Sequence, residues 1–240
     1  MILRRLYLYL VSAAALGTLA AGLSLLGMTI LLFVFNDPTA DSQRPAAAGF
    51  SAMTLVALPV WGVHYWFARR YALRDPAERA SAIRRLYIYW ACLVMSIGAA
   101  IALAVTLARV LNPVLDGGKF DQLAASQGAW TTAVLLALWA FHFRVASRDR
   151  AAVGEQGAPA TLRRWYIYLA LLFGWVMLLS GASYLMQLAW LKTLHGLPSY
   201  QVLSDPAGEL LGGLALWGYH ARTLAVRFIE DDRKSTLRAL

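Results

Sequence analysis

Residues 84–89 read Arg84-Arg85-Leu86-Tyr87-Ile88-Tyr89, and a long apolar stretch follows them. The same pattern of two arginines and two alternating tyrosines opens two further segments: Arg4-Arg5-Leu6-Tyr7-Leu8-Tyr9 and Arg163-Arg164-Trp165-Tyr166-Ile167-Tyr168. Each segment closes with a tryptophan three residues before a histidine: Trp61/His64, Trp139/His142 and Trp217/His220. Successive histidines are 78 residues apart. Similarity at one period predicts tandem copies of one supersecondary unit, and we place the repeats at residues 1–78, 79–157 and 158–240.

The composition is that of a membrane protein. Of the 240 residues, 60% are hydrophobic and only 15% are charged, whereas a soluble domain carries about 25% charged residues. The net charge of +9 would fit a nucleic-acid partner, but the basic residues lie at the ends of apolar blocks, where they orient helices in a bilayer. We therefore expect a lipid environment and no nucleic-acid partner. Cys92 is the single cysteine, so no internal disulfide forms.

Six apolar blocks predict the membrane spans. They cover Leu6–Phe35, Phe50–Phe67, Leu86–Ala108, Gly128–Phe143, Trp165–Leu191 and Leu210–Ala221. The first block is too long for the core of a signal peptide, so we expect it to be retained as a helix. In each repeat a long block precedes a shorter one, which predicts a long helix, a loop and a short helix. The expected fold is all-α: a six-helix transmembrane bundle of three tandem helical hairpins, for which a pseudo-threefold axis is one arrangement.

The basic residues also predict the orientation. With six spans, 18 of the 22 lysines and arginines fall on the side of the chain termini. Because lysine and arginine concentrate on the cytoplasmic side, we expect a multi-pass protein of the inner (cytoplasmic) membrane with both termini in the cytoplasm.

The repeated openings place arginines and tyrosines at the expected membrane surface. There, arginines bind lipid phosphates and tyrosine rings lie at headgroup depth. One interpretation is general anchoring, and a sharper one is a specific site for anionic lipids or for another membrane subunit. The residues concerned are Arg4, Arg5, Tyr7, Arg84, Arg85, Tyr87, Arg163, Arg164 and Tyr166.

His64, His142 and His220 are candidate functional residues, because ionisable side chains within a membrane are costly and often functional. Four roles are open: a neutral histidine hydrogen-bonded to another helix, an axial ligand of haem or chlorin, part of a three-histidine metal site, and a proton carrier. The neighbouring tryptophans and leucines crowd the helix face that a macrocycle would need, which favours the first role. We therefore expect neither a bound metal nor a cofactor. His195 lies outside the pattern, in an expected loop.

Small residues recur at equivalent positions of the long blocks: Gly22 and Ser24, Ala102 and Ala104, and Gly181 and Ser183. Small side chains allow helices to approach closely in lipid, so we expect these positions to lie in helix contacts.

The tandem hairpins with their Arg-Arg-x-Tyr-x-Tyr openings resemble a bacterial membrane-domain family of unknown function, built from repeated two-helix units. That resemblance implies no activity and supplies no catalytic residue. The chain also lacks a Walker loop, a metalloprotease HExxH and a dinucleotide-binding glycine pattern. We expect a non-enzymatic accessory or structural membrane subunit. The alternatives are a haem- or chlorin-binding electron-transfer or pigment subunit, and a small channel or transporter.

Overall fold

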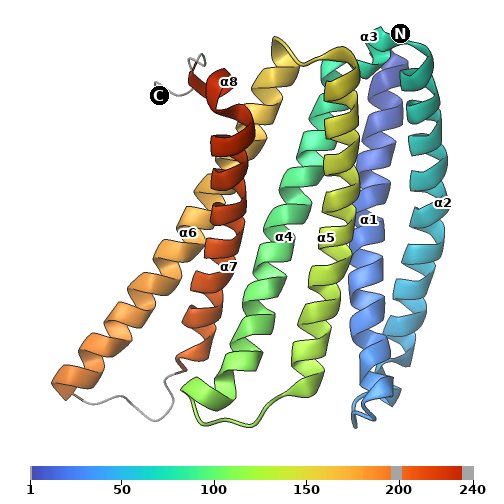
Figure 1. Cartoon of the computed structure of the whole chain (residues 1–240). Coiled ribbons are helices and arrows are strands. Elements are labelled where there is room, and N and C mark those ends of the chain that lie inside the picture. Colours follow the sequence, from blue (N-terminus) through green and yellow to red (C-terminus); the bar gives the residue numbers. More distant parts are fainter. Residues whose placement is uncertain (1, 196–201, 234–240) are drawn as a thin grey trace. The chain divides into compact units, whose positions relative to one another are not determined.

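A computed structural model describes residues 2–195 and 202–233, except for the side chains of His195, Asp231 and Asp232 (Figure 1). These residues form an all-α structure, with no β-strand among them. The loop expected around Pro198 and the basic tail with Lys234 and Arg238 lie outside the described residues. The elements, in chain order, are α1 (Ile2–Val34), the 3₁₀ turn η1 (Asp41–Gln43), α2 (Arg44–Arg74), α3 (Pro76–Arg79), α4 (Ala82–Leu115), α5 (Gln122–Val153), α6 (Ala158–His195), α7 (Ser204–Thr223), the π-helical η2 (Leu224–Phe228) and α8 (Ile229–Arg233).

Five helical segments are long and apolar enough to cross a membrane. They are Ile2–Val34, Asp41–Arg74, Pro76–Leu115, Gln122–Val153 and Ala158–Leu194. A membrane span needs about 20 residues at 1.5 Å each, and all five exceed that length. These segments indicate a membrane protein. The expected sixth span corresponds to α7, a helix of 20 residues that does not reach the same apolar content.

The helices extend well past the apolar blocks. In the first two pairs the lengths are nearly equal, 33 and 31 residues for α1 and α2 and 34 and 32 for α4 and α5. The expected alternation of long and short helices is therefore wrong for these pairs, and it holds only for α6 and α7, with 38 and 20 residues. Hydropathy measures the apolar part alone, whereas alanine and arginine, both good helix formers, continue α2 and α5 by several turns beyond it.

Two helix ends show how the local sequence affects where a helix ends. Asn36 adopts a positive φ of 53° after α1, and the amide groups of Asn36 and Asp37 donate to the carbonyl oxygens of Phe33 and Leu32. This arrangement satisfies the last carbonyl groups of the helix. In contrast, the pair Asn112-Pro113 does not end α4. Pro113 lies inside the last turns of this helix, which continues to Leu115.

The residues group into two compact units. The first comprises Met1–Met95 and Trp130–Arg163. Within it, α1 and α2 lie side by side (Figure 1). A Cβ atom at Gly22 would lie 2.7 Å from Oγ1 of Thr54 in α2, which confirms Gly22 as a position of close helix contact.

The second unit comprises Ser96–Ala129 and Arg164–Leu240. In it, α7 packs on α6, since a Cβ atom at Gly181 would lie 2.6 Å from the backbone nitrogen of Leu210, and Gly181 is likewise confirmed as a contact position. Another face of α7 meets the carboxyl-terminal half of α4, where a Cβ atom at Gly208 would lie 2.3 Å from the carbonyl oxygen of Ala104. Of the two alanines expected at helix contacts in α4, Ala104 makes this contact, and Ala102 is half-buried.

Candidate functional site

Each of the three motif histidines forms a hydrogen bond with the first tyrosine of an Arg-Arg-x-Tyr-x-Tyr motif. The distances from the tyrosine hydroxyl to Nε2 of the histidine are 3.3 Å for Tyr7 and His64, 3.1 Å for Tyr87 and His142, and 2.8 Å for Tyr166 and His220. The first pair is partly exposed, and the other two are buried. The sequence identified all six residues but gave no reason to pair them.

The hydrogen bonds define the tautomer of each neutral histidine ring. Nδ1 of each histidine lies 2.8–2.9 Å from the carbonyl oxygen four residues earlier, in Val60, Leu138 and Leu216 respectively. A carbonyl oxygen can only accept, so Nδ1 carries the hydrogen atom. In the neutral ring Nε2 is then the acceptor, and the tyrosine hydroxyl donates to it. Both nitrogen atoms of each histidine are thus used within the protein.

The tryptophan of the first motif extends this arrangement. Nε1 of Trp61 donates to the hydroxyl oxygen of Tyr87 over 3.0 Å, and Tyr87 in turn donates to His142. The Trp61 ring lies 6.2 Å from the ring of His142 and stacks on Tyr65. Trp61 lies three residues before His64 in the sequence, but its ring contacts the histidine of the next motif.

This geometry does not fit axial ligation of a macrocycle. Haem ligation needs a histidine nitrogen with an available lone pair. In each motif histidine Nε2 already accepts from a tyrosine, and Nδ1 faces its own helix backbone. Among the residues that the structure describes, no three His, Cys, Asp or Glu side chains gather into a metal-binding group.

The arginine pairs bind carboxylate groups of the protein itself. Arg4 and Arg5 both donate to Glu78 in α3, whose side chain is 5% exposed. Nε of Arg84 donates to Oδ2 of Asp149 over 2.7 Å, and its Nη1 donates to the hydroxyl oxygen of Tyr9. These bonds join α1, α3, α4 and α5 at one end of the first unit.

A second buried ion cluster centres on Glu155, in the connection between α5 and α6. Its carboxylate accepts from Tyr89 over 2.6 Å and from Arg163, and it lies 3.5 Å from Nη1 of Arg85. Arg85 is fully buried, and it also donates to the carbonyl oxygen of Ala146. A buried charge is tolerated only when it is paired in this way.

These positions differ from the expected lipid interface. Arg84, Arg85 and Arg163 are at most 4% exposed, and so are Tyr87 and Tyr166. Their charges are paired inside the protein, because Asp149 in α5 and Glu155 in the connection between α5 and α6 supply the carboxylates. Of the residues expected at lipid, Arg4 and Tyr7 are exposed, and Arg5 and Arg164 are partly exposed.

Sequence reasoning missed the carboxylates that bind these arginines. A signal was present, because Glu78 and Glu155 are 77 residues apart, close to the 78-residue period. Each lies in a basic connecting segment shortly before an arginine pair.

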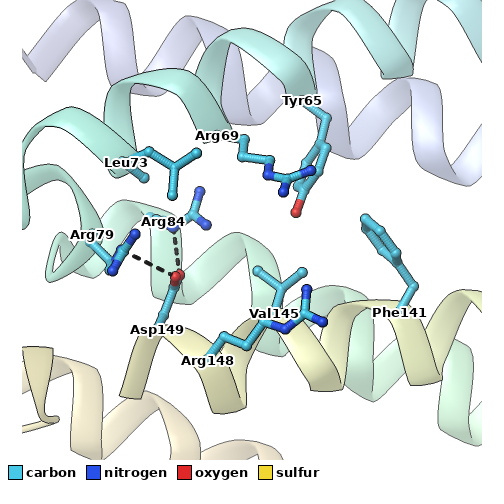
Figure 2. A pocket seen from close by; sticks show the side chains of 10 residues that line it. Tyr65, Arg69, Leu73, Arg79, Arg84, Phe141, Val145, Arg148 and Asp149 are labelled. Atoms are coloured by element: carbon cyan, nitrogen blue, oxygen red, sulfur yellow. Dashed lines mark hydrogen bonds and ion pairs between the residues drawn. The ribbon is translucent and has the colours of Figure 1, made fainter. Parts of the chain in front are cut away.

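A small cavity adjoins Asp149 in the first unit, and Figure 2 shows the residues around it. Its volume is about 150 Å³. Its lining comes from α2, α3, α4 and α5, so tertiary packing creates it. The lining residues are Tyr65, Arg69, Ala72, Leu73, Arg79, Arg84, Phe141, Val145, Arg148 and Asp149.

The chain matches one known protein family. A family model described as "Domain of unknown function (DUF5671)" matches residues 5–131. This match covers more than half of the 240 residues, and the chain belongs to that family. The expected resemblance to a family of unknown function is thereby confirmed. No curated protein and no solved structure matches the chain.

Proposed function

We propose that this member of the DUF5671 family is a non-enzymatic accessory or structural subunit of the cytoplasmic membrane. In this proposal it packs against partner membrane proteins or anionic lipids. Its architecture is a six-helix bundle of three tandem hairpins, with α7 as the sixth span and a pseudo-threefold relation among the hairpins as the simplest symmetric arrangement.

One observation carries the proposal: the histidines and the buried arginines of the repeated motifs bind other side chains of the same protein. The histidine nitrogens of all three Tyr–His pairs are occupied, and Arg84, Arg85 and Arg163 are paired with Asp149 and Glu155. Catalytic or ligating groups need a face open to substrate or cofactor. Groups whose partners all lie in the same chain serve instead to join helices.

The repeated Tyr–His contact supports the three-hairpin organisation. The paired residues are separated by 57, 55 and 54 positions, and each pair joins the start of one long helix to the end of the next long helix. A contact that recurs at matching motif positions is expected when one unit has been duplicated.

The distribution of basic residues supports the orientation. The positive-inside rule counts lysines and arginines and gives little weight to acids, so the ion pairs with Glu78, Asp149 and Glu155 leave the count unchanged. With 18 of 22 basic residues on one side, both termini lie in the cytoplasm in this proposal.

The test is purification of the full chain from its native membrane in a mild detergent, followed by native mass spectrometry and a visible absorption spectrum. The proposal expects a colourless species heavier than the 26.4 kDa chain, with a second protein or bound anionic lipid in fixed stoichiometry. A Soret band, or a bare monomer without lipid or partner, would contradict it.

A further inference from the structure

The polar lining of the cavity beside Asp149 is mostly cationic. Its charged residues are Arg69 in α2, Arg79 in α3, Arg84 in α4, and Arg148 and Asp149 in α5. Four guanidinium groups thus face one carboxylate, a formal excess of three positive charges. Figure 2 shows them arranged around one space, with the Tyr65 hydroxyl group directed into it.

Asp149 neutralises only part of this charge. Its Oδ2 accepts from Arg84 over 2.7 Å, whereas its Oδ1 lies 3.7 Å from Nε of Arg79. That Nε atom is buried and makes no hydrogen bond. A buried donor without an acceptor costs about 1–3 kcal/mol, so this position favours a ligand that supplies an acceptor.

Two further arginines on the cavity wall have no counter-ion. Within residues 2–195 and 202–233, neither Arg69 nor Arg148 forms an ion pair or hydrogen bond. Both side chains are exposed, so a ligand can reach them from solvent. Like charges held together repel one another, and an anion between them would relieve that repulsion.

The chemistry of the lining identifies the anion. Guanidinium groups present planar, permanently charged donor pairs that match phosphate oxygens. Here they converge from four helices, which suits a tetrahedral group. The volume of about 150 Å³ is smaller than the ~300–1,000 Å³ of pockets for drug-sized ligands, and it is suited to a headgroup-sized anion.

We propose that this cavity binds a phosphate group, carried either by an anionic phospholipid or by a soluble phosphate ester. For the lipid, this inference rests on the proposed function and names a site for the anionic headgroup, to which the proposed function assigns no residues. Two apolar residues on the wall favour the lipid, because Leu73 is 62% and Phe141 36% exposed. They offer an apolar surface for an acyl chain beside the arginines.

The experiment uses the full chain in a neutral detergent and isothermal titration calorimetry. The probes are dioctanoyl-phosphatidylglycerol, zwitterionic dioctanoyl-phosphatidylcholine, glycerol phosphate and inorganic phosphate. The variants are Arg69→Gln and Arg148→Gln, whose exposed side chains hold no helix together. Arg70→Gln is the matched control, since Arg70 is an exposed neighbour that does not line the cavity and lies over Trp66 instead.

Loss of one charge-assisted hydrogen bond weakens binding about tenfold or more. We therefore expect phosphatidylglycerol to bind the wild type, to bind each cavity variant at least about tenfold more weakly, and to bind Arg70→Gln as it binds the wild type. Arg148→Lys, which keeps the charge but loses the paired donors, should bind at an intermediate strength.

The remaining probes identify the source of the phosphate. Tight binding of glycerol phosphate or inorganic phosphate, with the same loss in the cavity variants, would support the site and assign it to a soluble ester. Equal loss in Arg70→Gln, equal affinity for phosphatidylcholine, or no binding of any phosphate probe would overturn the proposal. The proposed function would survive that outcome, because it rests on the paired side chains and not on this cavity.

Discussion

The hydroxyl group of Tyr166 lies 2.8 Å from Nε2 of His220, and both side chains are buried. The contact joins α6 to α7, and it is the shortest of the three Tyr–His bonds. Nδ1 of His220 donates to the carbonyl oxygen of Leu216, which fixes the orientation of the ring. Among the described residues, only Tyr166 forms a hydrogen bond with Nε2. The pair therefore joins α6 to α7, the helix that does not reach the apolar content of the five candidate spans.

Removal of the Tyr166 hydroxyl group should destabilise the protein. Tyr166→Phe leaves Nε2 of His220 without a donor in a buried site, which costs about 1–2 kcal/mol. We expect a lower melting temperature in detergent. Tyr184→Phe, at a half-exposed position of the same helix, should melt as the wild type does. Equal melting of all three proteins would show that the Tyr166–His220 bond contributes nothing.

The histidine of the second motif should tolerate a polar replacement better than an apolar one. His142 is fully buried and bonds to Tyr87. His142→Gln can still accept from Tyr87, whereas His142→Leu leaves the Tyr87 hydroxyl group without its acceptor. We expect the leucine variant to unfold at the lower temperature in detergent. A glutamine variant less stable than the leucine variant would contradict the hydrogen-bonded role.

Substitution of Glu155 should strongly reduce the free energy of unfolding. The Glu155 side chain is 1% exposed and faces Arg85 and Arg163. Glu155→Ala leaves two buried guanidinium groups without their carboxylate, and loss of one partner of a buried ion pair costs about 3–5 kcal/mol. The control is Asp41→Ala, which breaks an exposed pair with Arg44 and should change the free energy of unfolding by less than about 1 kcal/mol. Similar losses in both variants would show that burial of the cluster does not matter.

The sequence allowed the all-α class and the apolar segments to be predicted, because hydropathy and the repeat are local signals. It also identified His142 and Tyr87, but not their bond, since which side chains meet depends on helix packing. Arginines beside an apolar block, such as Arg85, fit either a lipid surface or a buried ion pair. The choice depends on a carboxylate elsewhere in the chain, here Glu155, and the regular spacing of Glu78 and Glu155 was the available clue.

Acid should weaken the attachment of α7 through Asp116. This residue follows α4, and its carboxylate accepts from the backbone amides of Leu203 and Ser204 over 2.6 and 3.1 Å. Burial of Asp116 acts to raise the pKa, but the bonds from Ser204, Leu203 and Asn112 outweigh it, and the pKa is lowered from 3.8. A lowered folded-state pKa stabilises the fold above the unfolded pKa, and that contribution disappears as the pH falls through the folded value.

The measurement for Asp116 is the melting temperature of the wild type and of Asp116→Asn across pH. At pH 7 we expect the variant to melt lower, because it loses a negative charge at the start of α7. The difference should shrink as the pH falls below 3.8, where the wild-type carboxylate becomes protonated. A difference that stays constant down to pH 2 would mean that the charge of Asp116 is not involved.

Membrane orientation can be tested with single cysteines and an impermeant maleimide on intact cells. The native Cys92 is fully buried, so its background labelling should be low. Cysteines at Ser42 and Gln122 should react from outside, as should one at Ser199, which lies outside the described residues. A cysteine at the exposed Ala151, near the arginines at the end of α5, should react only after the cells are opened. The reason is electrostatic, because basic segments are retained on the cytoplasmic side during insertion. Labelling of Ala151→Cys in intact cells would contradict the predicted orientation. It would show that the cationic cavity lies outside the cytoplasm.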